Sequence, residues 1–130
     1  MTGTLQCFVL DCPDPLALAR FYATLLDGEV NRPDRRWSLG ADWATLHIAG
    51  GQVLCFQGVP DYRPPRWGDA GHPQQAHLDI GVADLDEAGA EAVRRGARVL
   101  DSGAVGRSWR VYADPAGHPF CLVRERFADA

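Results

Sequence analysis

WRVYADPAGHPFCLV, residues 109–123, combines two short apolar runs with a turn between them. The turn is the Asp-Pro-Ala-Gly segment at 114–117, because proline presets φ and glycine accepts a positive φ without a steric penalty. The runs at 109–113 and 120–123 are rich in aromatic and β-branched residues, which suit a pleated surface. The stretch therefore predicts two strands joined by a tight turn, with Cys121 in the middle of the second strand.

The same pattern occurs once earlier in the chain. An offset of 66 positions aligns GGQVLCF at 50–56 with AGHPFCL at 116–122. An offset of 70 positions aligns Asp14 with Asp84, and each of these residues precedes a run with helical spacing. Two similar offsets in one chain indicate an internal duplication. We therefore expect two related modules.

The composition excludes several classes of protein. The chain has 130 residues, 46% of them hydrophobic, which is enough for one packed domain. The net charge of −4 and the absence of a basic run longer than two residues argue against nucleic-acid binding. All thirteen basic residues are arginine, which rules out a Schiff-base lysine and a P-loop lysine.

The chain shows no sequence signal for export or for membrane insertion. The first fifteen residues lack a basic segment followed by an apolar one, and the longest uncharged run, 43–60, is interrupted by polar residues and glycines. We expect a cytoplasmic protein. In a reducing compartment its four cysteines are free, metal-bound or catalytic rather than paired as disulfides.

The first module spans 5–59 and reads βαβββ. Asp14 is an N-cap, Pro15 suits the first helical position, and Gly28 ends the helix. The expected strands are 5–10, 37–39, 43–48 and 52–59.

The second module spans 75–124 and again reads βαβββ. Asp84 caps its helix with Glu87 completing a capping box, and Gly96 ends it. The expected strands are 75–82, 98–100, 109–113 and 120–123. The proline-rich segment 60–73 between the modules is an irregular connector.

The order of these motifs resembles the vicinal oxygen chelate (VOC) superfamily. Within it, the chain looks most like the glyoxalase-like domains of the glyoxalase, bleomycin-resistance and dioxygenase group. The resemblance rests on CPDP at 12–15, VPDYRPP at 59–65 and HPFCLV at 118–123, and it covers nearly all of the chain. It implies a single α+β domain, residues 1–130, whose two βαβββ modules form a curved, cup-like, eight-stranded sheet around a small-molecule pocket. A homodimer is also expected, since sheet edges and loop aromatics need cover.

The resemblance also implies where a metal would bind. Metal-using members carry ligands on the first and last strand of each module, and these positions are Cys7, Cys55, His77 and Cys121 here. Only His77 agrees with the usual His, Gln and Glu pattern. Three thiols and an imidazole suit a zinc site, whereas cysteines in strands also pack as small buried hydrophobes. We therefore expect no cofactor, with a divalent metal such as zinc as the alternative.

The predicted function is the binding of a small aromatic or apolar molecule, and the alternative is a VOC-type lyase, isomerase or dioxygenase. In the alternative, His77 is the catalytic base or a metal ligand, since its pKa range permits proton transfer. Tryptophan and other aromatic side chains either stack on a flat ligand or fill the core and the dimer interface. The candidate ligand-binding residues are Gln75, His77, Asp79, Phe56, Trp43, Trp67, Trp109 and Tyr112.

Overall fold

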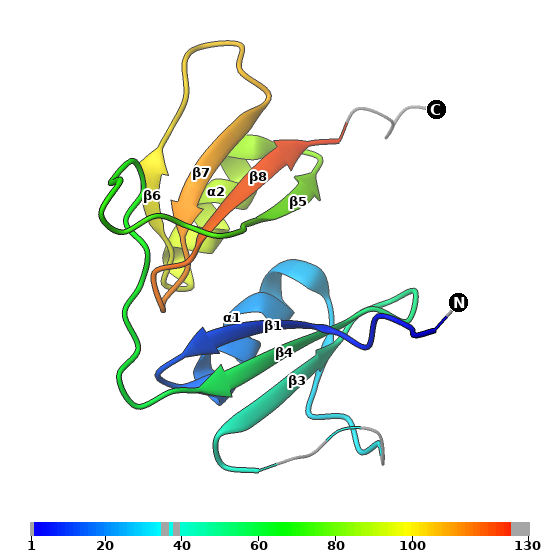
Figure 1. Cartoon of the computed structure of the whole chain (residues 1–130). Helices are drawn as coiled ribbons and strands as arrows, with labels where there is room; N and C mark the ends of the chain where they lie inside the picture. Colours follow the sequence, from blue (N-terminus) through cyan, green and yellow to red (C-terminus); the bar gives the residue numbers. More distant parts are fainter. Residues whose placement is uncertain (1, 35–36, 38–39, 126–130) are drawn as a thin grey trace. The chain divides into compact units, whose positions relative to one another are not determined.

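The computed structural model of the chain describes residues 2–34, 37 and 40–125. The chain divides into two compact units, Met1–Tyr62 and Arg63–Ala130, and each has the element order βαβββ (Figure 1). The strands of the described residues form two four-stranded mixed sheets, one in each unit. The predicted α+β fold with two βαβββ modules is thereby confirmed.

The first unit consists of one helix packed on one sheet. In the sheet, β1 runs parallel to β4, while β4–β3 and β3–β2 are antiparallel pairs, so the strand order is β1-β4-β3-β2. A parallel pair needs a crossover between its strands, and the helix lies within that crossover. The elements are β1 (Phe8–Cys12), α1 (Pro15–Leu26), β2 (Glu29–Val30), β3 (Trp43–His47) and β4 (Val53–Gly58).

Helix α1 begins where the sequence predicts and ends one residue earlier. The Asp14 side chain accepts a hydrogen bond from the Ala17 N–H, which satisfies one of the free donors of the first turn. The left-handed residue at the end is Asp27, with φ 50°, and not Gly28. Gly28 has a packing role instead, because a Cβ there would lie 2.4 Å from Cδ1 of Leu46.

The edge strand of the first sheet is not the one that the sequence suggests. Trp37 lies in a bend, and the rest of the predicted strand 37–39 lies outside the described residues. The strand that pairs with β3 on the side away from β4, and so forms this edge of the sheet, is β2, which has only two residues. Asn31 follows it with φ 54°, and its side-chain oxygen accepts a hydrogen bond from the Thr45 N–H. Two residues carry no periodicity, so no sequence pattern marks this strand.

The second unit repeats the arrangement of the first. Its strand order is β5-β8-β7-β6, with β5 parallel to β8, and α2 covers one face of the sheet (Figure 1). The elements are β5 (Leu78–Val82), α2 (Leu85–Arg94), β6 (Arg98–Asp101), β7 (Trp109–Ala113) and β8 (Pro119–Arg124). Strand β7 has the predicted bounds, whereas β5 begins three residues later than predicted.

The turn between β7 and β8 is built around Asp114. Its Oδ1 accepts hydrogen bonds from the N–H groups of Ala116, at 2.8 Å, and of His118, at 3.0 Å, while its Oδ2 lies 2.7 Å from Nδ1 of His118. Gly117 takes φ 93°, as the sequence predicts for this turn. The buried carboxylate thus organises the backbone that connects the two central strands.

Each unit has its own aromatic layer between sheet and helix. In the first, the Phe56 ring stacks on Tyr22 of α1, with ring centroids 6.0 Å apart. In the second, Phe120 stacks on Tyr112 at 5.7 Å, and the Tyr112 hydroxyl lies against Gly89 of α2. These rings are almost fully buried. The helix-facing rows of the two sheets are therefore occupied by core residues.

Within the described residues, none of the helices has both the length and the apolar character that crossing a membrane requires.

Candidate functional site

The second unit brings three of the predicted site residues together. Nε2 of His77 lies 3.2 Å from Oδ1 of Asp79, and Asp79 is the strand partner of Cys121. The imidazole nitrogen, carboxylate oxygen and thiol sulfur of this group all lie within 4.8 Å of one another. The His77 and Asp79 side chains are 37% and 63% exposed. This group, His77, Asp79 and Cys121, is called the His-Asp-Cys cluster below.

Gln75 is placed differently from its predicted neighbours. It lies in a bend before β5 and is exposed, so strand alternation does not orient it. His77 also precedes the strand, so strand alternation does not orient its side chain either. Its contact with Asp79 orients the imidazole instead. The interaction of His77 with Asp79 thus holds, but the polar strip does not extend to Gln75 along a strand.

Cys121 is a protonated thiol at neutral pH. Burial first, and then the neighbouring Asp79 carboxylate, together raise its pKa from 9.0 to about 11. A thiol becomes a good metal ligand or nucleophile only as the thiolate. Without a bound cation, Cys121 therefore behaves as a small buried hydrophobe.

The same face of the second sheet carries Trp109. Its strand neighbour Val111 is the register partner of Cys121, and residues two apart on a strand share a face. The guanidinium of Arg107 lies over the Trp109 ring, 3.7 Å from the ring centroid. Trp109 is partly exposed, and a cation at this distance fixes the orientation of its indole.

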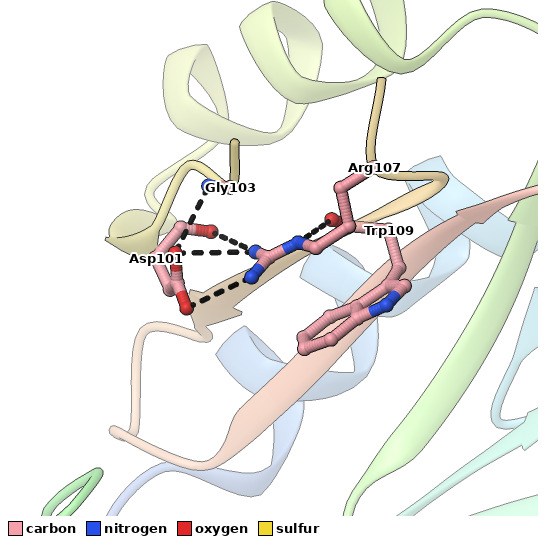
Figure 2. Close-up of polar contacts among 4 residues, drawn as sticks. All are labelled: Asp101, Gly103, Arg107 and Trp109. Carbon is pink, nitrogen blue, oxygen red and sulfur yellow. Dashed lines mark hydrogen bonds and ion pairs between the residues drawn. The ribbon is translucent and has the colours of Figure 1, made fainter. Parts of the chain in front are cut away.

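Arg107 is itself held in place by two residues, Asp101 and Trp109, as Figure 2 shows. Its Nε donates to the Trp109 carbonyl at 2.9 Å, and its guanidinium pairs with the Asp101 carboxylate at 3.1 Å. Asp101 also accepts a hydrogen bond from the Gly103 N–H at 2.9 Å. The Arg107 hydrogen bond, followed by that of Gly103, lowers the pKa of Asp101 below 3.8. This Asp101–Arg107–Trp109 clamp was absent from the sequence prediction.

A sequence signal for the clamp exists but is weak. Asp101 is followed two residues later by a glycine with φ 79°, which is typical of an Asp side chain that bonds to its own turn. Nothing in the local pattern shows that this turn would meet Arg107 across the loop.

In the first unit the candidate cysteines form a pair of their own. Burial first, and then a hydrogen bond with the Cys7 thiol, together raise the pKa of the Cys55 thiol from 9.0 to about 12. Cys55 is fully buried, while Cys7 is half-buried. The Cys55 thiol is thus protonated at neutral pH and is suited to packing and to a hydrogen bond with Cys7.

The face that carries Cys55 also holds a buried histidine that sequence reasoning missed. Thr45 is the register partner of Cys55, and its hydroxyl lies 3.0 Å from Nε2 of His47. Nδ1 of His47 lies 3.2 Å from the guanidinium of Arg32. Because a guanidinium only donates, Nδ1 accepts and the proton is assigned to Nε2, which donates to Thr45. His47 is therefore a positioned donor and not a base toward Thr45.

Two tryptophans of the first unit bury indole N–H groups that have no hydrogen-bond partner in the described part of the chain. They are Trp37 and Trp43, and Trp43 shares a strand face with Thr45. A buried donor without a partner costs free energy, so each N–H is suited to a water molecule or to a polar ligand atom. Trp43 was predicted as a ligand-binding residue, and Trp37 was not.

Two predicted wall residues lie on the wrong face. Phe56 stacks on Tyr22 of α1, and Tyr112 lies against α2, so both belong to the helix-facing rows. Cys55 comes one residue before Phe56, and Cys121 comes one residue after Phe120. Each cysteine therefore points to the sheet face opposite the helix. Phe56 and Tyr112, which the sequence predicted as ligand-binding residues, therefore lie on the faces opposite the cysteines and belong to the core. Trp67 lies in the connector and is partly exposed.

The predicted ligand set divides between the two units. Cys7 and Cys55 belong to the first unit, whereas His77 and Cys121 belong to the second. In the second unit, Asp79 lies beside His77 and Cys121. The sequence predicted Asp79 as a residue that binds the small molecule and not as a metal ligand.

Comparison with known protein families gives one match. The family described as "Glyoxalase-like domain" matches residues 7–123, which is most of the chain. A sequence search of the curated proteins finds no match to this chain.

Solved structures of similar fold cover nearly the whole chain. The hypothetical protein SA1046 from S. aureus is 18% identical with a TM-score of 0.67, covering 96% of this chain and 99% of its own. A glyoxalase/bleomycin resistance protein/dioxygenase family enzyme from Burkholderia phytofirmans is 14% identical with a TM-score of 0.68, covering 94% and 98%. The fosfomycin resistance protein FosX from Mesorhizobium loti is 13% identical with a TM-score of 0.68, covering 99% and 97%. At these identities the likeness concerns the fold.

Proposed function

The chain belongs to the glyoxalase-like domain family of the VOC superfamily, and from this premise we propose that it binds a small aromatic molecule without a metal ion. The observation that carries the proposal is the pairing of exposed, interacting His77 and Asp79 with a fixed indole, Trp109, on one face of the second sheet. Such a face offers one polar anchor and one stacking surface, which is the usual composition of a small-molecule site.

The spacing of these groups sets the size of the ligand. Asp79 and Trp109 lie on β5 and β7, which are separated by β8. Two strand intervals amount to about 10 Å, which a bicyclic or tricyclic molecule spans. Asp101 neutralises Arg107, so the stacking end of the site does not require an anionic ligand. An uncharged or weakly charged aromatic molecule with one hydrogen-bonding group meets these requirements.

The donor atoms at the family's metal positions support binding without a metal. Hard cations prefer oxygen ligands, and three of the four positions carry thiols. The raised pKa values of Cys55, about 12, and Cys121, about 11, mean that a metal would have to displace tightly held protons.

One observation favours a second candidate, an enzyme of the lyase, isomerase or dioxygenase kind. The His-Asp-Cys cluster offers nitrogen, oxygen and sulfur donors within 4.8 Å, a set that fits zinc. A zinc ion held there would act as a Lewis acid toward a substrate oxygen. Alternatively, His77 takes a proton from the substrate, with Asp79 stabilising the imidazolium.

We further propose a cytoplasmic homodimer. Strand β1 lies at the edge of the first sheet, and Leu5, Phe8 and Val9 in or just before it are exposed. An open strand edge with apolar side chains is suited to a second copy of the chain. Light scattering across the micromolar range tests this, and a monomer mass throughout contradicts it.

Titration calorimetry tests the binding proposal. Aromatic compounds are first selected by thermal shift, and the best one is titrated with and without EDTA. We expect unchanged affinity with chelator, and a loss of about 1 kcal/mol in His77→Ala for one hydrogen bond. His72→Ala is the matched control, because His72 lies 3.2 Å from Asp69 in the same kind of pair but within the connector.

The outcomes separate the two candidates. Affinity that disappears on chelation overturns metal-free binding and favours the zinc enzyme. Unchanged affinity in His77→Ala contradicts the role of His77 in ligand binding.

A further inference from the structure

The second unit contains a cleft of about 350 Å³ that the proposed ligand site does not use. It lies where the start of α2 meets the loop before β7 and the ends of β7 and β8. This volume is at the lower end of the range for small-molecule sites. Its lining residues are Ala83, Asp84, Leu85, Asp86, Gly106, Arg107, Arg110 and Arg124.

The cleft lies on the opposite face of the sheet from the His-Asp-Cys cluster. Arg110 shares a strand face with Tyr112, which lies against α2. Arg124 shares a face with Leu122, which is the register partner of Arg110. Cys121 points the other way. The two sites therefore lie on opposite faces of the sheet, and Arg107 is the residue that they share, because it lines the cleft and also lies over Trp109.

Two of the three lining arginines lie on neighbouring strands and on the same face of the sheet. Arg110 on β7 and Arg124 on β8 are diagonal neighbours on one face, with a spacing of about 7–8 Å between such positions. Like charges at this spacing repel. Arg107 contributes less, because its guanidinium is already bound to Asp101 and lies over Trp109.

The carboxylates of the cleft neutralise this pair only in part. Asp86 contacts Arg110 at 2.8 Å, but its side chain is 87% exposed, and exposed ion pairs are weak. The Asp84 side chain accepts a hydrogen bond from the Glu87 N–H and caps α2. Within the described part of the chain, the side chain of Arg124 forms no ion pair. Among the lining side chains three arginines face two aspartates, which gives the cleft a formal charge of +1 in a protein of net charge −4.

We propose that this cleft binds a phosphate group, either as inorganic phosphate or as a phosphomonoester. A tetrahedral dianion relieves the repulsion between Arg110 and Arg124 and accepts paired hydrogen bonds from each guanidinium. It competes with Asp86 for Arg110. The partial positive charge at the start of α2 adds to the attraction, although the arginines carry the site.

Nuclear magnetic resonance titration at constant ionic strength tests the proposal with the full chain. Inorganic phosphate and glycerol phosphate should each shift the backbone amides of Leu85, Asp86 and Gly106 in a saturable manner, whereas chloride should not. The tighter of the two shows whether the group binds free or as an ester.

Three variants are expected to change the phosphate affinity in three different ways. Arg124→Gln should weaken phosphate binding at least tenfold, and Asp86→Asn should strengthen it about threefold by releasing Arg110. Arg94→Gln, at the far end of α2, should leave it unchanged. The proposal is overturned if phosphate causes no saturable amide shifts in the wild type. It is also overturned if Arg124→Gln binds phosphate with unchanged affinity. Either result leaves the aromatic-ligand proposal intact, because that site lies on the other sheet face.

Discussion

The two units share one topology but distribute their polar groups differently. In the first, the imidazole of His47 is buried on β3 and bonded to Thr45 and Arg32. In the second, His77 stands before β5 with an exposed contact to Asp79. A duplicated backbone therefore does not imply duplicated chemistry. The first unit buries its strand histidine, whereas the second exposes the contact of His77 with Asp79 to solvent.

The largest expected effects concern the part in which the units are alike. Phe56 and Phe120 are both 0% exposed and stack on Tyr22 and Tyr112. Substitution of either by alanine leaves a cavity between sheet and helix. We expect each variant to lose about 3–5 kcal/mol of unfolding free energy, measured by urea denaturation. A loss in only one variant would show that the two aromatic layers are not equivalent.

The next prediction compares a buried and an exposed Asp-His pair. Asp114 and Asp69 each accept a hydrogen bond from a backbone N–H and contact a histidine at Nδ1. Only Asp114 is buried, so Asp114→Ala leaves two part-buried N–H groups without an acceptor. We expect it to cost about 2–3 kcal/mol of unfolding free energy. Asp69→Ala, the matched control, should leave thermal stability unchanged, and equal losses would contradict the role of burial.

The buried thiols of the two units should produce a common alkaline instability. Their pKa values in the folded protein, about 12 for Cys55 and about 11 for Cys121, exceed the ordinary 9.0. Above pH 9 the unfolded chain releases these protons first, so stability is present below that pH and falls as pH rises. The expected slope is at most about 1.4 kcal/mol per pH unit for each thiol.

Denaturation from pH 8 to pH 11 measures this slope. Cys55→Ala and Cys121→Ala should each make the slope shallower than in the wild type. A slope that neither substitution changes would assign the alkaline loss to other groups.

The smallest effect is expected at Asp101, in the clamp that only the second unit has. Its lowered pKa means that the ionised carboxylate stabilises the folded state above the ordinary value of 3.8, and that this stability is lost as pH falls further. Asp101→Asn should therefore lower the melting temperature slightly at pH 7, and the difference should shrink below pH 4. A difference that persists in acid would contradict the ionic origin.

Local signals explain which parts of the fold could be predicted. The Asp-Pro start of α1 and the Asp84 cap of α2 are short-range features, and both helices begin where these residues place them. The turn after β7 depends on residues 114–118 alone. By contrast, β2 has two residues and acquires its pairing only from β3.

The candidate site was predicted in part for the same reason. The contact of His77 with Asp79 involves residues two apart, so sequence proximity brought it within reach of prediction. His47 with Arg32, and Arg107 with Asp101, join residues separated by loops. Loop geometry decides such contacts, and no periodicity reports it.

The amino-acid sequence by itself determined the duplication, the two helices and the strand positions of Cys55 and Cys121, whereas Cys7, expected within the strand 5–10, lies before β1. It also determined which side chains share a strand face, because that alternation is a property of the backbone. Only the tertiary structure decided which face each helix covers. In β7, Val111, Tyr112 and Ala113 are all buried, so the pattern of apolar residues does not distinguish the two faces. Packing of Tyr112 against Gly89 of α2 makes the distinction, and it thereby assigns Trp109 to the candidate site and Arg110 to the arginine-lined cleft.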